Sequence, residues 1–239
     1  MIQTQIHKWN AQEFERLVLE NGPRVAVFDC DGTLWGGDSG HGFMVWSLEQ
    51  GLVSRETSDW IDTRYRAYLA GHVTEPQICG EMVQMYAGLR EAELRSAAAR
   101  YVGEMVRPRV FAEIESLMRV LSAQGAELWA VSSTNKWVVS EGVRALGIPE
   151  SRVLAAEVAV KDGVIGSELL DVPTDEGKAV ALLRVGRPRP DAVFGNSIHD
   201  LAMLKMTDHP YPVNPSPALL EAAAKNGWGF FRPEAAEGV

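Results

Sequence analysis

Two carboxylates, Asp29 and Asp31, lie two residues apart directly after the apolar run 25–28. A short continuous apolar run of strand-forming residues predicts a buried parallel strand, so both acids follow its carboxyl end. Two like charges this close are costly unless a cation or a proton relieves them. Mg²⁺ suits carboxylates that leave room for waters and a substrate phosphate. The pair therefore predicts a metal and phosphate site, with a turn capped by acids as the simpler interpretation.

Other predicted strands also end in polar segments. Residues 132–135 follow a strand over 127–131, and residues 195–200 follow a strand over 192–194. Strands alternating with helices of ten or more residues predict right-handed crossovers and a mostly parallel sheet covered on both faces. Because ligands bind beyond the carboxyl ends of such strands, we expect these tips to converge with 29–33 on one site.

Local patterns predict the remaining elements of this α/β fold. The helices expected from apolar periodicity and stop signals cover 6–20, 110–124, 137–146, 175–185, 200–206 and 217–225. Asp162-Gly163 lies between the runs 154–160 and 164–169, a pairing of turn and strands that predicts a β-hairpin. A last short strand is expected over 211–213.

The stretch 40–107 differs in character from the rest of the chain. It is rich in aromatic residues and helical patterns, contains no clear strand, and interrupts the alternation directly after the first polar tip. We therefore expect a helical insertion folded over the site as a cap domain. Residues 1–39 and 108–239 would then form the α/β core domain.

Composition limits the classes of partner. The 239 residues are 46% hydrophobic and 23% charged, as in ordinary globular proteins. A net charge of −9 without a long basic run disfavours nucleic acid and favours a small molecule. No secretion signal or membrane-span pattern is seen, and Cys30 and Cys79 form no CxxC or Cys/His cluster. We expect a cytoplasmic protein without a membrane partner, and leave the oligomeric state open.

The first motif resembles a known family. Val27-Phe28-Asp29-Cys30-Asp31-Gly32-Thr33-Leu34 is similar to the hhhDxDGT signature of the haloacid dehalogenase-like phosphohydrolase superfamily. Val131-Ser132, Lys178 at a helix start, and Gly195-Asn196-Ser197-Ile198-His199-Asp200 resemble the later motifs in order. The resemblance spans about residues 24–230 and implies a doubly wound, Rossmann-like core. Because the insertion follows the first motif, the chain is similar to the C1-capped, phosphoserine-phosphatase-like branch.

The resemblance implies catalytic roles that match the chemistry required. Asp29 would attack phosphorus to form an aspartyl-phosphate. Asp31 would protonate the departing alkoxide and later deprotonate water; the dehalogenases of the superfamily lack this acid, so Asp31 favours a phosphate ester. Lys178 would neutralise charge on the transferring group. The residues expected to bind substrate are Thr33, Asp38, Ser132, Ser133 with its backbone N–H, and Lys178.

The fourth motif departs from the usual GDxxxD, because Asn196 stands where the family has its first acid. An amide oxygen can still ligate a hard cation, but a full negative charge is lost. We therefore expect Mg²⁺ as the cofactor, bound more weakly. The expected ligands are Asp29, Asp31, Asn196 and Asp200, with Asp31 acting through its backbone carbonyl by analogy and Asp200 acting directly or through a water.

Residues near the predicted cap bear on the substrate. Asp38 occupies the place where phosphoserine phosphatases carry a Glu that recognises the substrate amine, whereas no arginine corresponds to their carboxylate-binding one. We thus expect an amine-bearing ester that is phosphoserine-, phosphocholine- or phosphoethanolamine-like. The missing arginine weakens the case for phosphoserine itself as the substrate. The tryptophans Trp35, Trp46 and Trp60 would either cage a cation or pack the cap.

The leading hypothesis is a Mg²⁺-dependent phosphatase acting on a small phosphorylated metabolite. A phosphotransferase or mutase using the same intermediate is the first alternative. A catalytically weak regulatory protein that binds a phosphorylated ligand is the second, because Asn196 weakens the metal site. Arg64 and Arg66 would contact an anionic substrate or lie in solvent, and His199 would touch the phosphate or lie at the surface.

Overall fold

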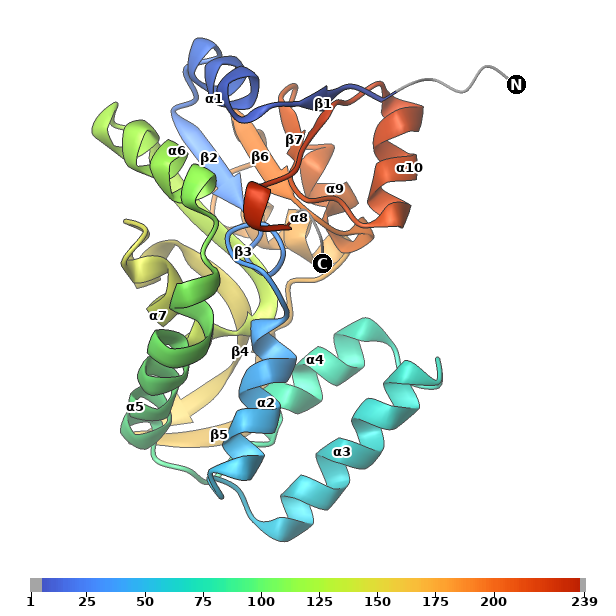
Figure 1. Ribbon diagram of the computed structural model, residues 1–239. Helices are drawn as coiled ribbons and strands as arrows, with labels where there is room; N and C mark the ends of the chain where they lie inside the picture. The colour runs from blue at the N-terminus through green and yellow to red at the C-terminus, as the bar shows by residue number, and fades with distance from the viewer. Residues whose placement is uncertain (1–5, 237–239) are drawn as a thin grey trace.

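The computed structural model describes residues 6–236, built around a six-stranded sheet of order β5-β4-β3-β2-β6-β7 (Figure 1). The strands are β2 (Val25–Phe28), β3 (Glu127–Asn135), β4 (Val153–Lys161), β5 (Val164–Asp171), β6 (Ala192–Gly195) and β7 (Pro210–Pro212). Every neighbouring pair is parallel except the β4–β5 hairpin. The predicted mostly parallel α/β fold is therefore confirmed.

Helices cover both faces of this sheet. The helices outside the insertion are α1 (Ala11–Glu20), α6 (Ala112–Ala123), α7 (Lys136–Arg144), α8 (Glu176–Arg184), α9 (Leu201–Leu204) and α10 (Pro217–Asn226). Along β2, Ala26 and Phe28 join the apolar cluster that includes side chains of α1, α6 and α7. Val27 points the other way, into the cluster formed with α8, α9 and α10. The sheet is thus doubly wound, as expected.

The start of the chain differs from the prediction of a helix over 6–20. Lys8–Trp9 forms β1, which pairs in parallel with β8 (Phe230–Phe231). Helix α1 begins only at Ala11, because the Asn10 side chain accepts from the backbone N–H of Glu13 at 2.9 Å and caps it. Local periodicity could not reveal a pairing partner more than 200 residues away.

Strand β3 is longer than predicted, whereas the β4–β5 hairpin has the predicted turn. Strand β3 continues to Asn135, so the polar tip 132–135, expected to follow the strand, is part of it. Its pairing with β4 shifts register between Val131 and Asn135. The hairpin between β4 and β5 is confirmed. Its loop residues Asp162 and Gly163 have φ of 52° and 75°, as a tight two-residue turn requires.

The insertion consists of helices joined by short loops, as predicted. It contains α2 (Ser39–Glu49), α3 (Arg55–Leu69), α4 (Glu75–Gln84), α5 (Glu91–Tyr101), a π-helical turn (Val102–Val106) and a 3₁₀ turn (Arg107–Arg109). Helices α3 and α4 project beside the carboxyl end of the sheet, whereas α5 packs on α7 (Figure 1). The division into a core and a cap at residues 40 and 107 stays a prediction. In residues 6–236, no helix is long and apolar enough to span a membrane.

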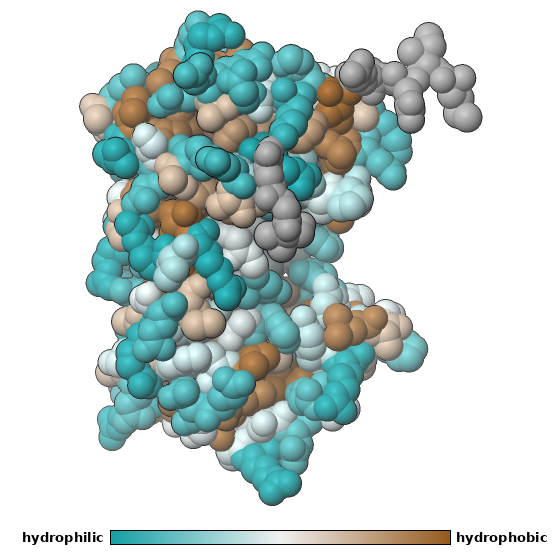
Figure 2. Space-filling model, in the orientation of Figure 1, coloured by the Kyte–Doolittle hydropathy of each residue, from teal (hydrophilic) through white to brown (hydrophobic). Residues whose placement is uncertain are grey.

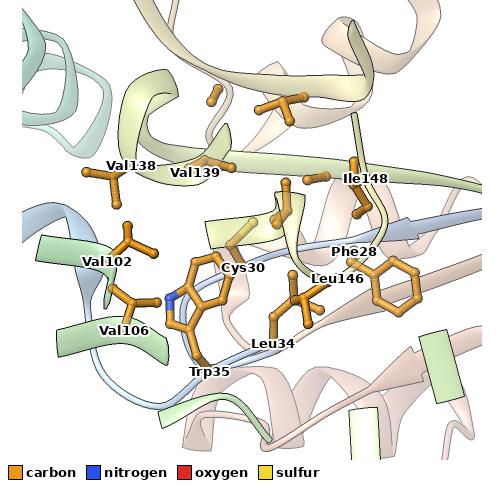
Figure 3. Close-up of a cluster of buried hydrophobic side chains, with 14 of the residues drawn as sticks. Phe28, Cys30, Leu34, Trp35, Val102, Val106, Val138, Val139, Leu146 and Ile148 are labelled. Atoms are coloured by element: carbon orange, nitrogen blue, oxygen red, sulfur yellow. The ribbon is translucent and has the colours of Figure 1, made fainter. Parts of the chain in front are cut away.

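The chain leaves and re-enters the core through two adjacent segments. The backbone N–H of Gly36 donates to the Arg109 carbonyl at 3.0 Å, and that of Phe111 donates to the Leu34 carbonyl at 2.9 Å. Figure 3 shows the Trp35 indole packed beside Val106 of the π-helical turn and beside Leu34. With 1% of its surface exposed, Trp35 anchors this junction beneath the first motif.

Candidate active site

A cavity of about 390 Å³ lies where the carboxyl ends of β2, β3 and β6 face helices α3 and α4. Figure 2 shows the molecule hollowed on its right side, between these two helices and the core. The residues of the predicted tips that line it are Asp29, Asp31, Ser132, Ser133, Thr134, Asn135, Asn196, Ser197 and His199. The three polar tips therefore converge on one site, as predicted.

Asp29 lies at the floor of this cavity with 5% of its surface exposed. Its Oδ1 accepts from Lys178 Nζ at 2.7 Å and its Oδ2 from Thr33 Oγ1 at 2.9 Å. Burial, and then the neighbouring Asp200 carboxylate, raise the pKa of Asp29 above the ordinary Asp value. Thr33 is fully buried and does not line the cavity, so its geometry is that of a group orienting Asp29.

Lys178, at the start of α8, is a buried cation held between two carboxylates. Its Nζ donates to Asp29 as above and to Asp200 Oδ1 at 2.5 Å. Burial alone would lower the pKa of Lys178, but Asp200 and Asp29 raise it above its ordinary value. The side chain therefore stays charged, and it reaches both the cavity and Asp29.

Asp31 is held through both of its carboxylate oxygens. Oδ1 accepts from Trp35 Nε1 and from the backbone N–H of Ser39, each at 2.7 Å. Oδ2 accepts from Thr134 Oγ1 at 2.7 Å. Burial, and then the nearby Asp38, raise the pKa of Asp31, which favours its protonated form. The sequence did not indicate Trp35 and Thr134 as partners of this acid.

Asp200 has no exposed surface and does not line the cavity. Its Oδ2 accepts from the backbone N–H groups of Asn196 and Ser197, each at 2.9 Å, while Oδ1 accepts from Lys178. These bonds occupy both carboxylate oxygens of Asp200, on the side of the β6 loop and Lys178. Its observed geometry orients Lys178 and the β6 loop, and its role toward a metal stays a prediction.

The cavity contains side chains that could hold a metal ion. A Cβ on Gly32 would lie 1.8 Å from Asn196 Nδ2, so only glycine there lets the Asn196 amide reach the first motif. Asp29 and Asn196 both line the cavity, and each carries a hard oxygen donor. Within residues 6–236, no three His, Cys, Asp or Glu side chains cluster to hold a metal. Oxygen donors of this kind suit a hard cation such as Mg²⁺, whereas Zn²⁺ is more often held by Cys and His.

The other predicted binding residues line the same cavity. Ser132 is 2% exposed, and its Oγ accepts from the backbone N–H of Thr134 at 3.2 Å. Asp38 caps α2 by accepting from the backbone N–H of His41 at 2.9 Å. His199, which the sequence left unassigned, pairs through Nδ1 with Asp175 Oδ1 at 2.7 Å and faces the cavity.

The suggested tryptophan cage is wrong, because Trp35, Trp46 and Trp60 do not line the cavity. Trp35 belongs to the core, and Trp46 packs against aromatic neighbours of the insertion. The aromatic residues that do line it are Tyr65 and Tyr68 of α3.

The two cap arginines considered for an anionic substrate are also occupied elsewhere. Arg64 makes two 2.8 Å bonds to Glu81, and Arg66 pairs with Asp62 one turn away on α3. Neither lines the cavity. Of the Lys and Arg residues in the described chain, Lys178 alone forms part of the wall.

The sequence of this chain resembles those of known proteins. A family model described as haloacid dehalogenase-like hydrolase matches residues 26–205. The chain belongs to this family. The expected superfamily and a hydrolytic enzyme are thus confirmed. A probable phosphatase of Mycobacterium tuberculosis is 29% identical over 87% of this chain and 76% of its own. A histidinol-phosphatase of Neisseria meningitidis is 24% identical over 85% of this chain and 96% of its own.

Solved structures show the same fold for this haloacid dehalogenase-like hydrolase. A Bordetella pertussis protein of unknown function has a TM-score of 0.77 and 24% identity, covering 87% of this chain and 98% of its own. A substrate-bound phosphoserine phosphatase has a TM-score of 0.59 and 16% identity, covering 88% and 92%. The predicted phosphoserine-phosphatase-like architecture is confirmed at the level of fold.

Proposed function

We propose that this hydrolase is a Mg²⁺-dependent phosphatase that cleaves a small phosphate monoester through an aspartyl-phosphate on Asp29. The observation that carries the proposal is the buried Asp29 carboxylate, which faces the cavity and is held by Lys178 and Thr33. A carboxylate oriented in this way can attack phosphorus in line, which divides one difficult displacement into two easier ones.

In the first step, an Asp29 oxygen bonds to phosphorus as the ester oxygen leaves with its electron pair. Asp31, as general acid, gives a proton to that oxygen, and the alcohol departs. In the second step, Asp31 takes a proton from water, which attacks phosphorus and releases Asp29 and inorganic phosphate. Lys178 and Ser132 would stabilise the negative charge of the transferring group. Bound at Asp29, Asn196 and the Asp31 carbonyl, Mg²⁺ would supply further positive charge.

The proposed substrate carries an amine and no carboxylate. Asp38 offers an acceptor for the amine on the cavity wall, and no arginine or lysine of α2, α3 or α4 lines the cavity to hold a carboxylate. Histidinol phosphate is an amino alcohol ester of this kind, and a relative is named for acting on it. We propose it as the first physiological substrate to test, ahead of phosphoserine, phosphocholine and phosphoethanolamine.

The direct test measures released phosphate from these esters, and nitrophenolate from p-nitrophenyl phosphate, with and without Mg²⁺. We expect hydrolysis that depends on the metal ion and that is lost in Asp29→Asn. Delivery of the phosphoryl group to an added alcohol faster than to water would instead indicate a phosphotransferase. Absence of turnover with Mg²⁺, Mn²⁺ and Co²⁺ would contradict the proposal.

Replacing Asn196 with the acid that the family usually has at this position is expected to raise the affinity for Mg²⁺. Asn196→Asp adds a negative charge beside Asp29, so the Mg²⁺ concentration for half-maximal activity is expected to fall about tenfold or more. A Mg²⁺ titration of p-nitrophenyl phosphate hydrolysis measures this shift. Asn226→Asp at the end of α10 is the control and should leave the titration unchanged. An unchanged midpoint in Asn196→Asp would show that position 196 does not ligate the metal. Activity seen only in that variant would favour the regulatory alternative.

A further inference from the structure

The cavity wall formed by α3 and α4 carries polar groups that the phosphoryl chemistry does not use. Tyr65 and Tyr68 come from α3, and Glu75 and Cys79 come from α4. They face the same cavity as Asp29, so a substrate whose phosphate reaches Asp29 has its alcohol portion beside them. Side chains in this position select among esters that share a phosphate but differ in the rest of the molecule.

Glu75 is held in one orientation as a hydrogen-bond acceptor. The Tyr68 hydroxyl donates to Glu75 Oε2, and Cys79 Sγ donates to Oε1 at 3.6 Å. Burial, followed by the bond to Glu75, raises the pKa of Tyr68, so the phenol remains protonated and continues to donate. Each carboxylate oxygen retains capacity for a further donor. No Lys or Arg of residues 6–236 forms an ion pair with Glu75, in contrast to Glu81 on the same helix, which Arg64 neutralises.

Asp38 and Glu75 lie at two places on one continuous wall. The His41 ring, next to the cap of α2, stacks on Tyr65 with 4.2 Å between ring centroids. Tyr65 in turn lies 5.8 Å from the ring of Tyr68, which bonds Glu75. Burial and then the carboxylates of Asp38 and Glu75 raise the pKa of Tyr65, and all three residues line the same cavity. The wall therefore offers two separated acceptors with aromatic surface between them.

We propose that Glu75 determines specificity by binding a second nitrogen of the substrate, beyond the amine that Asp38 accepts. The substrate class is then a phosphate ester of an amino alcohol that carries a further N–H donor, such as an imidazole or a second amine. This inference rests on the proposed phosphatase function. It adds the requirement that an ester with one nitrogen is a poorer substrate than an ester with two, because only the second nitrogen reaches Glu75.

The test compares Glu75→Gln with the wild type on three esters under saturating Mg²⁺. Histidinol phosphate has an amine and an imidazole, phosphoethanolamine has only the amine, and p-nitrophenyl phosphate has neither. Loss of a charge-assisted hydrogen bond is expected to lower kcat/KM for histidinol phosphate about 10- to 100-fold, mainly through KM. The other two esters should change by less than about threefold.

Two further variants separate binding from folding. Glu81→Gln, on the same helix but outside the cavity, should leave all three esters unaffected. Tyr68→Phe keeps the Glu75 charge but removes the donor that orients it, so a smaller loss confined to histidinol phosphate is expected. An equal loss of activity on all three esters in Glu75→Gln would indicate a structural role and overturn the inference. Unchanged activity of Glu75→Gln on histidinol phosphate would also overturn it.

The outcomes also distinguish this inference from the function on which it rests. If the wild type hydrolyses p-nitrophenyl phosphate but neither nitrogen-bearing ester, the second-nitrogen site is overturned while the phosphatase stands. If the wild type hydrolyses none of the three with any metal, the phosphatase itself fails and the inference fails with it.

Discussion

Asp29→Asn is expected to lower the turnover of p-nitrophenyl phosphate by about 10⁴-fold or more, because an amide cannot take the place of the attacking carboxylate. Assays with a ³²P-labelled ester, quenched soon after mixing, detect the attack of Asp29 on phosphorus directly. The wild type should yield a phosphoprotein that survives quenching in acid and is labile in alkali, whereas the Asn variant should yield none. Activity above about one percent of wild type, or an adduct that persists in the variant, would contradict the assignment of Asp29 as nucleophile.

The same substitution is expected to stabilise the metal-free protein at neutral pH. Because burial and Asp200 raise the pKa of Asp29 in the fold, holding it ionised costs free energy once the pH exceeds the ordinary Asp pKa. That cost grows until the pH passes the pKa of the folded state. The free energy of unfolding in urea should therefore favour Asp29→Asn more at pH 8 than at pH 4.5. A variant less stable at pH 8 would show that the Lys178 bond outweighs the burial of the charge.

Asp31→Asn is expected to slow phosphoenzyme formation by about 10²- to 10⁴-fold for alkyl esters, whose alkoxide needs a proton to leave. The nitrophenolate of p-nitrophenyl phosphate leaves without one, so the first step should proceed on that ester. The second step still needs a base for water. Rapid mixing should therefore show a burst of nitrophenolate equal to the enzyme concentration, followed by slow turnover.

A matched control keeps the acid but removes one of its partners. Thr134→Val deletes the hydroxyl that bonds Asp31 Oδ2, and it should cost less than Asp31→Asn on alkyl esters because the proton donor remains. Equal losses for Asp31→Asn on alkyl and aryl esters, without a burst, would show that Asp31 positions the site instead of transferring protons.

Local sequence determined which chemistry the chain carries and which strands hold it. The apolar run before Asp29 and Asp31, and the order of the later motifs, predicted one convergent site, because the carboxyl ends of parallel strands meet at one edge of a sheet. Asp162-Gly163 predicted its hairpin since few residue pairs adopt positive φ at both turn positions. Such features depend on a few neighbouring residues, so sequence reasoning reached them.

Only the tertiary structure decided which side chains contact one another across that site. Thr134 meets Asp31 across 103 residues, and the Trp35 indole donates to the same acid. The tryptophans near the first motif and in the insertion proved to lie outside the cavity, while Tyr68 and Glu75 proved to line it. The helical period of a segment tells which of its residues share a face, but not which part of the chain packs against that face. These contacts are set by long-range packing of the sheet and the inserted helices, which no local pattern records.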